Sequence, residues 1–309
     1  MVDRTGSTQP SNSIPAVSDA SESIQVSVVV ACRNAERYLG RQLEALASQS
    51  SAEPWELVLS DNGSTDRSRS IVEEFRDRLP RLVVIDSSDC VGPGAVRNAG
   101  VRAAKGDRLL FCDADDEVGP GWLAAMTEAL ESDGLVAARL EHDLLNEPWT
   151  RPARHPQPGL LETNPPFLPY TFCAALGVRR SVHEKIGGFD ESYRGAGEDR
   201  DYCYRAQLAG TRLVLAPNAV VHYRHRETAL GMYRQARGYG SANVRLYRDY
   251  RHLGLGRPPM ARAVVSWVLM PARLLFVWTA RHRFANWMAR LGWRRGRLEA
   301  SIRYRVWAL

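Results

Sequence analysis

The sequence predicts an α/β fold built on a mostly parallel β-sheet. Short apolar runs rich in β-branched residues alternate along the chain with segments whose apolar residues recur every three or four positions. An unbroken β-branched run is typical of a buried strand, whereas the spacing of three and four places side chains on one face of a helix. Regular alternation of the two is the pattern of a parallel sheet covered by helices.

Two strand–helix units open the predicted domain. Residues 26–31 form an apolar β-branched strand, and the leucines within residues 39–46 share one face of the helix that follows. Residues 55–59 form the next strand, and the Ser-, Asp- and Gly-rich residues 60–66 form a turn after it. Ligands of such sheets bind beyond the carboxyl ends of the strands, so this turn is a candidate binding loop.

The alternation continues to residue 215. The further predicted elements are a helix around 71–75, a strand at 82–85, a helix at 95–104, strands at 108–112 and 171–178, helices at 182–186 and 199–209, and a strand at 212–215. Seven prolines lie between Pro148 and Pro169 and exclude a helix or a central strand there. We expect a loop in that region, either a lid or a segment that faces a bound molecule.

Composition and charge limit the class of protein. The chain has 309 residues, of which 44% are hydrophobic and 25% charged, and these values exclude a disordered, collagen-like or multi-span membrane protein. The net charge of the chain is +6. Residues 251–309 hold twelve arginines and one glutamate and therefore carry +11, so residues 1–250 carry −5. Such asymmetry suggests a polyanionic partner surface, either a membrane or a nucleic acid.

The composition also divides the chain into three segments. Residues 1–23 are rich in Ser, Asp and Pro without an apolar core, so we expect a disordered tail there and not a signal peptide. Residues 24–226 form the α/β domain and residues 227–309 a helical extension rich in Arg and Trp. Five widely spaced cysteines without a CxxC pair favour neither disulfides nor a zinc site, and suit the reducing cytoplasm.

Five motifs occur in a recognisable order. They are VSVVVACRN at 26–34, ELVLSDNGSTD at 56–66, RNAG at 97–100, LFCDADD at 110–116, and GGFD at 187–190 leading to GED at 197–199. In order and spacing the chain resembles the family 2 glycosyltransferases over residues 25–226. The resemblance implies the GT-A fold and inverting transfer from a nucleotide-diphosphate sugar. One departure is Ala31-Cys32, where the family usually has Pro-Thr or Pro-Ser.

Asp113 and Asp115 are the predicted metal ligands. They lie two residues apart at the end of a strand, so their side chains point the same way. Carboxylate oxygens hold Mg²⁺ or Mn²⁺, and such a cation neutralises charge on a departing diphosphate. The resemblance assigns the metal to Asp115 and the ribose or a metal-bound water to Asp113, with Asp116 as a third carboxylate. The alternative is a solvated turn that caps the helix after Pro120.

Other residues are candidates for the nucleotide. The resemblance implies that Asp61 contacts the base and that Arg33 and Asn34, in the first motif, line the nucleotide site. An Asx-turn or a helix N-cap is the alternative for Asp61. Arg97 and Asn98 either reach the nucleotide or support the neighbouring loop.

An acid pair and a histidine complete the predicted site. Inverting transfer needs a base at the acceptor hydroxyl, and the resemblance assigns this role to Asp199, with Glu198 orienting it or touching the acceptor sugar. N-capping of the following helix is the alternative. His222 is a candidate for the metal or the pyrophosphate, although a lone histidine is often structural. Arg224 and Arg226 either bind phosphate or begin the basic surface.

The extension favours a lipid surface over a membrane span. Its apolar runs, residues 263–272 and 274–280, are each shorter than the ~20 residues that cross a bilayer. Tryptophans occur among the arginines, at Trp267, Trp278, Trp287, Trp293 and Trp307. This mixture is typical of an interfacial helix on anionic lipid. The alternative is a helical subdomain that buries these runs against itself or a second copy, so oligomerisation stays open.

The sequence therefore predicts an inverting glycosyltransferase that uses a nucleotide-sugar donor and a divalent metal. We expect its acceptor to be a hydroxyl of a lipid-linked or cell-envelope glycan, and the enzyme to be peripheral or monotopic at the cytoplasmic face of the cell membrane. A sugar nucleotidyltransferase is one alternative, but a Gly-rich phosphate loop is missing after the first strand. A nucleic-acid binder is the other, but the long apolar stretches do not suit it, and we expect no nucleic-acid partner.

Overall fold

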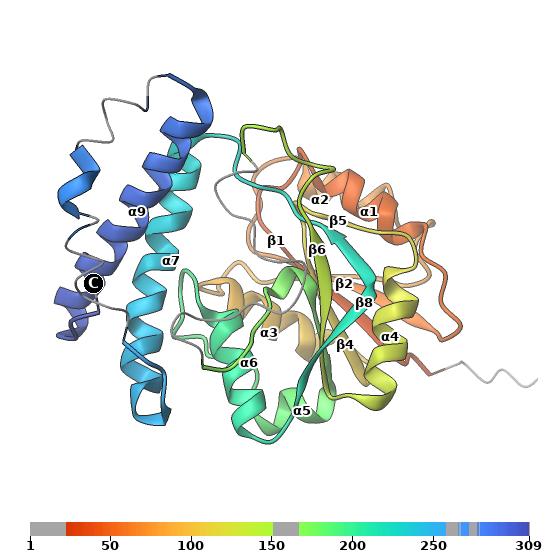
Figure 1. The fold of residues 1–309 in the computed structure, drawn as a ribbon. Coiled ribbons are helices and arrows are strands. Elements are labelled where there is room, and N and C mark those ends of the chain that lie inside the picture. Colours follow the sequence, from red (N-terminus) through yellow and green to blue (C-terminus); the bar gives the residue numbers. More distant parts are fainter. Residues whose placement is uncertain are drawn as a thin grey trace, which may run out of the picture.

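The computed structural model describes residues 23–150, 167–257, 265, 267–271, 277 and 279–308. Within them, eight strands form one sheet in the order β3-β2-β1-β4-β7-β6-β8-β5 (Figure 1). The strands are β1 (Val26–Cys32), β2 (Trp55–Asp61), β3 (Leu82–Asp86), β4 (Arg108–Asp113), β5 (Glu117–Val118), β6 (Leu135–Glu141), β7 (Leu176–Arg179) and β8 (Leu213–His222). Only β5 and β7 run against the other strands of this sheet, which confirms a mostly parallel α/β fold.

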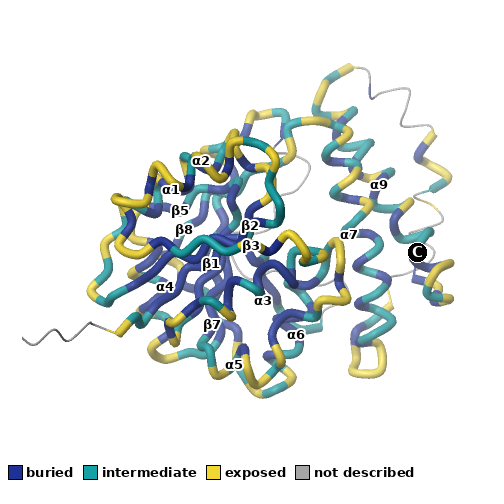
Figure 2. Tube along the Cα trace, turned by 180° about the vertical axis from the view of Figure 1, so that it is seen from behind, coloured by how far each residue is buried: buried dark blue, intermediate teal, exposed yellow. Residues whose placement is uncertain are grey.

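Helices cover both faces of the sheet, because alternate residues of its central strands are apolar on both sides. One face carries α1 (Leu39–Ala47), α2 (Ser68–Glu73) and α4 (Trp122–Ser132), and the other carries α3 (Pro93–Ala103), α5 (Arg180–Lys185) and α6 (Glu198–Leu208). Figure 2 shows the strands as the most deeply buried part of the molecule, with exposed residues gathered in loops.

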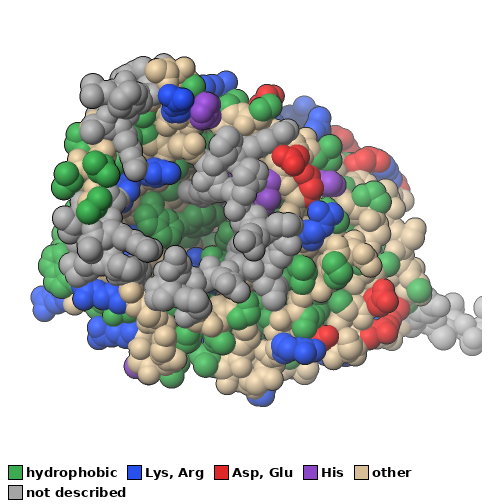
Figure 3. All heavy atoms as spheres, viewed as in Figure 1, with side chains coloured by type: hydrophobic (Ala, Val, Ile, Leu, Met, Phe, Trp, Pro, Cys, Tyr) green, Lys and Arg blue, Asp and Glu red, His purple; other side chains and the backbone are tan. Residues whose placement is uncertain are grey.

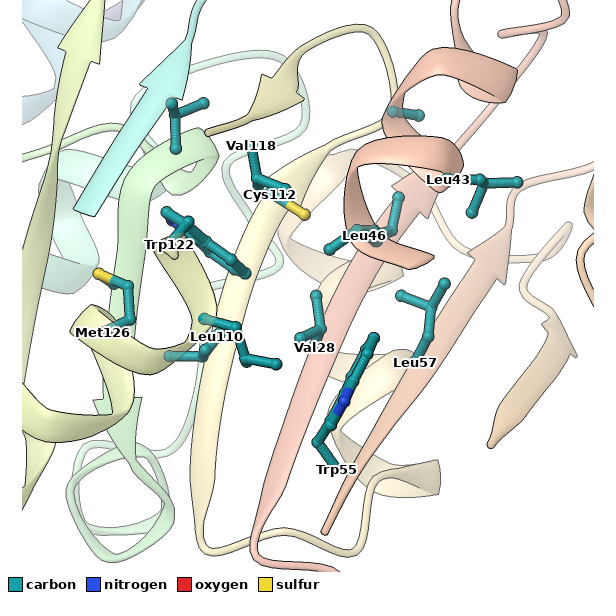
Figure 4. Close-up of a cluster of buried hydrophobic side chains, with 14 of the residues drawn as sticks. Val28, Leu43, Leu46, Trp55, Leu57, Leu110, Cys112, Val118, Trp122 and Met126 are labelled. Carbon is teal, nitrogen blue, oxygen red and sulfur yellow. The ribbon is translucent and has the colours of Figure 1, made fainter. Parts of the chain in front are cut away.

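The central strand β1 shows how this core forms. Val28 pairs with Leu57 of β2 and Leu110 of β4, and the three side chains pack beneath α1 and α4 (Figure 4). Val29 points to the opposite face and belongs to the cluster that includes Phe111. Truncation of a large side chain in such a core costs about 2–5 kcal/mol, so the sheet is a rigid base for the loops at its edge.

Three elements differ from the prediction. The sequence does not predict β6, which lies between β7 and β8. The strand predicted at residues 212–215 continues as β8 to His222, and the strand predicted at 171–178 begins as a 3₁₀ helix (Cys173–Ala175) before β7. The continuation of β8 depends on an irregularity in its pairing, because Ala138 pairs with Ala216 whereas the next residue of β6 pairs with Val220.

Two long helices form the C-terminal part, α7 (Ala229–Tyr250) and α9 (Arg281–Tyr304). They lie side by side and run in the same direction (Figures 1 and 2). A Cβ atom added to Gly296 would overlap the carbonyl oxygen of Arg237, and one added to Gly240 would overlap that of Trp293. The two backbones therefore touch through a seam of small residues, which excludes larger side chains.

The α7 helix also packs on the sheet domain. The Tyr250 hydroxyl lies 2.6 Å from Asp201 Oδ1 of α6, and a Cβ atom on Gly197 would meet the Ala242 side chain at 2.8 Å. Helix α7 therefore packs on α6 and on the residue that precedes it. The domain boundary at residue 226 stays a prediction.

Several predictions concern residues outside the described ranges. They include residues 1–22 of the predicted disordered tail, most of the Pro-rich segment, and much of the apolar runs at 263–280. Of the helices in the described part of the chain, none combines the length and the apolar character that a bilayer crossing requires.

Candidate active site

A cavity of about 730 Å³ lies beside the carboxyl ends of β1 and β4. Its wall contains five of the predicted site residues, Arg33, Asn34, Arg97, Asp113 and Asp115. The two strands are parallel neighbours, and Ala31 at the end of β1 pairs with Asp113 at the end of β4. The pairing explains how residues about 80 positions apart reach one site, as parallel sheets arrange their ligand sites.

Three carboxylates meet at the end of β4. Asp113, Asp115 and Asp116 each offer an oxygen, and these oxygens lie within 4.8 Å of one another. Burial and the charges of the neighbouring aspartates raise the pKa of Asp115 and of Asp116. Mutual repulsion of this kind is relieved by a cation, and clustered carboxylate oxygens are the donors that Mg²⁺ and Mn²⁺ prefer. The group therefore fits a divalent metal.

Asp116 differs from the other two carboxylates because it is almost completely buried. Its Oδ1 accepts a hydrogen bond of 2.7 Å from the backbone N–H of Arg224, which anchors the segment after β8. Its Oδ2 is buried without a hydrogen bond within the described part of the chain. The Asp116 carboxylate thus lies on the buried side of the three carboxylates, whereas Asp113 and Asp115 face the cavity.

Arg97 connects the carboxylates to the acid pair. Its Nη2 lies 2.7 Å from Asp113 Oδ1, and its Nη1 lies 3.0 Å from Glu198 Oε1. The side chain is only 6% exposed, and although burial opposes its charge, the neighbouring carboxylates Asp113 and Glu198 raise the pKa of Arg97, so it stays charged. Its neighbour Asn98 instead binds the backbone N–H and C=O of Phe189, both at 2.9 Å. Arg97 thus belongs to the cavity, whereas Asn98 supports the loop.

Glu198 and Asp199 occupy the first turn of α6. The N-cap of this helix is Gly197, which has a φ of 93° and makes no side-chain cap, so Asp199 is not the N-cap. Burial, together with the charge of Asp199, raises the pKa of Glu198 to about 7 against the opposing effect of Arg97. Burial also raises the pKa of Asp199. Neither residue lines the cavity wall, and Glu198 is linked to it through Arg97.

Asp61 lies beside the cavity and not in its wall. The carboxylate is 1% exposed, accepts the backbone N–H of Ser64 at 3.2 Å and pairs with Arg69 at 2.5 Å. These contacts agree with the turn-forming alternative, and it is the next residue, Asn62, that lines the cavity. The base contact of Asp61 stays a prediction.

Arg33 and Asn34 follow β1 at the cavity wall. Asn34 has a φ of 50°, and its Oδ1 accepts the backbone N–H of Thr65 at 2.8 Å. Its backbone N–H donates to Ser64 Oγ at 3.0 Å. Arg33 reaches Asn62 Oδ1 at 3.4 Å. Asn34 therefore holds the turn after β2 against the end of β1 and shapes the wall.

The structure does not bring His222 into the carboxylate group. His222 ends β8, and its Nδ1 lies 2.7 Å from Glu141 Oε2 of β6. The three grouped ligands in the described residues are aspartates, so the metal role of His222 stays a prediction. His225, three residues further along the chain, lies with its Nε2 3.1 Å from His142 Nδ1.

Comparison with known proteins identifies the class. The model of glycosyl transferase family 2 matches residues 27–187, which is more than half of the chain. A second model, glycosyl transferase family group 2, matches residues 168–293. The chain therefore belongs to glycosyl transferase family 2.

A curated relative and two solved structures extend this finding. The pre-mycofactocin glycosyltransferase of Mycobacterium tuberculosis is 30% identical over 79% of this chain and 52% of the relative. The chain thus spans about half the length of the curated relatives it matches. The mannosyltransferase of Pyrobaculum calidifontis in complex with GDP-Man and Mn²⁺ has a TM-score of 0.60 at 18% identity, covering 90% of this chain and 86% of that one.

The second structure is TarS 1–349 of S. aureus in complex with UDP-GlcNAc. Its TM-score is 0.51 at 17% identity, and the match covers 93% of each chain. At these identities the likeness concerns the fold, which is the GT-A glycosyltransferase fold in both cases. The expected fold and family are confirmed.

Proposed function

We propose that this chain transfers a sugar from a nucleoside-diphosphate sugar to an acceptor hydroxyl with inversion at the anomeric carbon. The observation that carries the proposal is the position of Arg97, which joins the carboxylate group at the cavity to the acid pair of α6. A single displacement requires a leaving-group site and a proton acceptor close together, and Asp199 is the residue next to Glu198, the partner of Arg97.

The donor side of the proposal uses Asp113 and Asp115, with Asp116 behind them. Their oxygens fit a divalent cation, which when bound supplies positive charge at the departing diphosphate. The cavity beside them is lined by Arg33, Arg194 and other polar residues, and it suits the nucleoside part. The related structures with GDP-Man and Mn²⁺ and with UDP-GlcNAc support a nucleotide sugar but leave the base open.

The acceptor side uses the acid pair. In our proposal Asp199 takes the proton of the acceptor hydroxyl as its oxygen attacks the anomeric carbon from the side opposite the diphosphate. Glu198 orients Asp199 and stays in place because its Oε1 binds Arg97 in the interior. The raised pKa of Asp199, which results from burial, makes this carboxylate a better proton acceptor than an exposed aspartate.

We further propose that the extension rests on an anionic lipid surface at the cytoplasmic side of the membrane and that the acceptor is a lipid-linked or cell-envelope glycan. Val265, Val268 and Leu269 are exposed at helical spacing, and hydrophobic side chains lie beside Lys and Arg over this part of the molecule (Figure 3). Salt-sensitive sedimentation with anionic vesicles would support this placement. DNA binding without vesicle binding would contradict it.

A thermal-shift panel tests the central proposal. UDP, GDP, dTDP and CDP are each added with and without Mn²⁺ to the full chain and to Asp115→Asn. One nucleotide should stabilise the wild type by about 2.7 kcal/mol at a hundredfold excess over its Kd, and most of this gain should need Mn²⁺. Asp115→Asn should lose the Mn²⁺-dependent part. Full transferase activity in both Asp115→Ala and Asp199→Asn would refute the site.

A further inference from the structure

Two arginines that follow β8, two positions apart, lie in opposite environments. The Arg224 side chain is 9% exposed. Its Nε donates to the Asp115 carbonyl at 2.8 Å, its Nη2 lies 3.1 Å from Glu117 Oε1, and its guanidinium lies 4.3 Å from the ring centre of Tyr38. With its backbone N–H on Asp116 as well, Arg224 is fixed.

Arg226 is held much more loosely. Its side chain is 51% exposed, lines the cavity, and places Nη1 3.0 Å from Asp115 Oδ2. Asp115 is one of the carboxylates that the proposed function assigns to the metal. A guanidinium and a divalent cation would therefore compete for the same carboxylate.

Asp113, the other carboxylate assigned to the metal, also pairs with an arginine, Arg97, but this side chain is held in place. Arg97 is buried, and its departure from Asp113 would also disturb the buried Glu198, since one guanidinium serves both anions. Breaking a buried pair leaves an uncompensated charge in the interior, whereas an exposed pair contributes little. Of the two arginines on the metal carboxylates, Arg226 is the one that can move.

The backbone on both sides of Arg226 is fixed, so movement is confined to the side chain. The backbone N–H of Arg224 is held by Asp116, and Thr228 caps α7 through a hydrogen bond of 3.0 Å from the Gly231 N–H to its Oγ1. A guanidinium on such a support is suited to phosphate oxygens, which it binds through two parallel hydrogen bonds.

We propose that Arg226 is an exchangeable counter-charge: it neutralises Asp115 while the site lacks a metal ion, and it binds the donor diphosphate after a divalent cation has replaced it on Asp115. This inference rests on the proposed function, because it presumes that the donor carries a diphosphate. In the absence of metal, Asp115 is then paired with Arg226. When a cation displaces the Arg226 side chain from Asp115, that side chain becomes available to the donor diphosphate.

The test is a pair of affinities that should change in opposite directions. Mn²⁺ binding to the nucleotide-free full chain is measured by calorimetry, and Arg226→Gln should bind Mn²⁺ about three- to fivefold more tightly, since an exposed competitor has been removed. UDP and GDP are then titrated at saturating Mn²⁺, and the nucleotide that binds the wild type should bind Arg226→Gln about tenfold more weakly. A purely structural role would weaken both.

Two matched variants sharpen the result. Arg226→Lys keeps the charge and should restore most of the competition with Mn²⁺. Arg37→Gln breaks the pair with Glu227 without touching Asp115, and its Mn²⁺ affinity should equal that of the wild type. An unchanged or weaker Mn²⁺ affinity in Arg226→Gln overturns the inference, as does undiminished nucleotide binding. If the wild type itself binds none of the nucleoside diphosphates, the proposed function is wrong, and this inference, which rests on it, is wrong as well.

Discussion

The sheet edge that carries the candidate site and the α7–α9 pair are assembled in opposite ways. Large aliphatic and aromatic side chains such as Leu57 and Trp122 fill the core of the sheet, and the functional side chains come from strand ends, loops and the helices α3 and α6 at its edge. The α7–α9 pair has a seam of glycines and alanines, where backbone meets backbone at Gly240 and Gly296. At the sheet edge, the side chains proposed to act on the substrate are therefore distinct from those that pack the core. In the α7–α9 pair, the small residues serve packing alone.

The difference predicts two kinds of variant. A substitution at the sheet edge should change activity with little effect on stability, because side chains such as Asp115 contribute little to the core. A substitution in the helix seam should change stability first, because an added methyl group has no space there. The predictions below test this separation.

The largest effect should follow Asp199→Asn. The amide keeps the shape of the side chain but accepts no proton, so kcat for sugar transfer should fall about 10³-fold, within the range for a lost general base. The melting temperature should stay close to that of the wild type, since the substitution removes a negative charge next to Glu198. Steady-state kinetics with the donor found by thermal shift, together with a thermal melt, provide both readouts.

Glu184→Gln is the matched control for Asp199→Asn. Glu184 is an exposed carboxylate on α5, and its substitution should leave kcat and stability unchanged. If Asp199→Asn unfolds the protein, or keeps most of its activity, then the separation of chemistry from packing does not hold at the start of α6.

The next largest effect should follow Gly296→Ala in α9. The added Cβ would overlap the carbonyl oxygen of Arg237, so the helices must move apart. Overpacking of this kind costs about 1–3 kcal/mol, and we expect the upper end because the obstacle is backbone. Urea unfolding should show the loss. Gly195→Ala is the control, because a Cβ there meets no atom within 4 Å, and equal losses in both variants would contradict the seam.

The sequence predicts the first half of the fold well for a physical reason. The strands β1, β2 and β4 are short, mostly apolar runs that are buried on both faces, so local pattern and final environment agree. The sequence does not predict β6, whose apolar run is diluted by two alanines and Arg139. It shortens β8 because Pro217 interrupts the pattern, and the pairing irregularity beside Ala216 explains how the strand continues past that proline.

The candidate site is predictable where spacing decides it and hidden where tertiary contact does. The spacing of Asp113 and Asp115 at a strand end predicts that they act together, and the structure brings their oxygens together although Asp115 already lies in the turn after β4. The contact of Arg97 with Glu198 joins residues 101 positions apart, and that of Arg226 with Asp115 joins residues 111 apart. No local pattern contains these pairs. The contact of His222 with Glu141 depends on β6, which the sequence does not predict, so sequence reasoning offers no partner for this histidine.

The smallest predicted effect concerns pH and tests whether the sheet edge is as independent of stability as the comparison implies. The pKa of Glu198 is raised from 4.5 to about 7, so the folded state binds this proton more tightly than the unfolded state does. The resulting stabilisation is complete below pH 4.5 and is lost as the pH rises through about 7. Glu198→Gln lacks this titrating proton, so its free energy of unfolding should fall less between pH 5 and pH 8 than that of the wild type, by about 1 kcal/mol. Urea titrations at pH 5 and pH 8 measure the difference, and identical pH dependence in the variant and the wild type would mean that Arg97 keeps Glu198 ionised throughout.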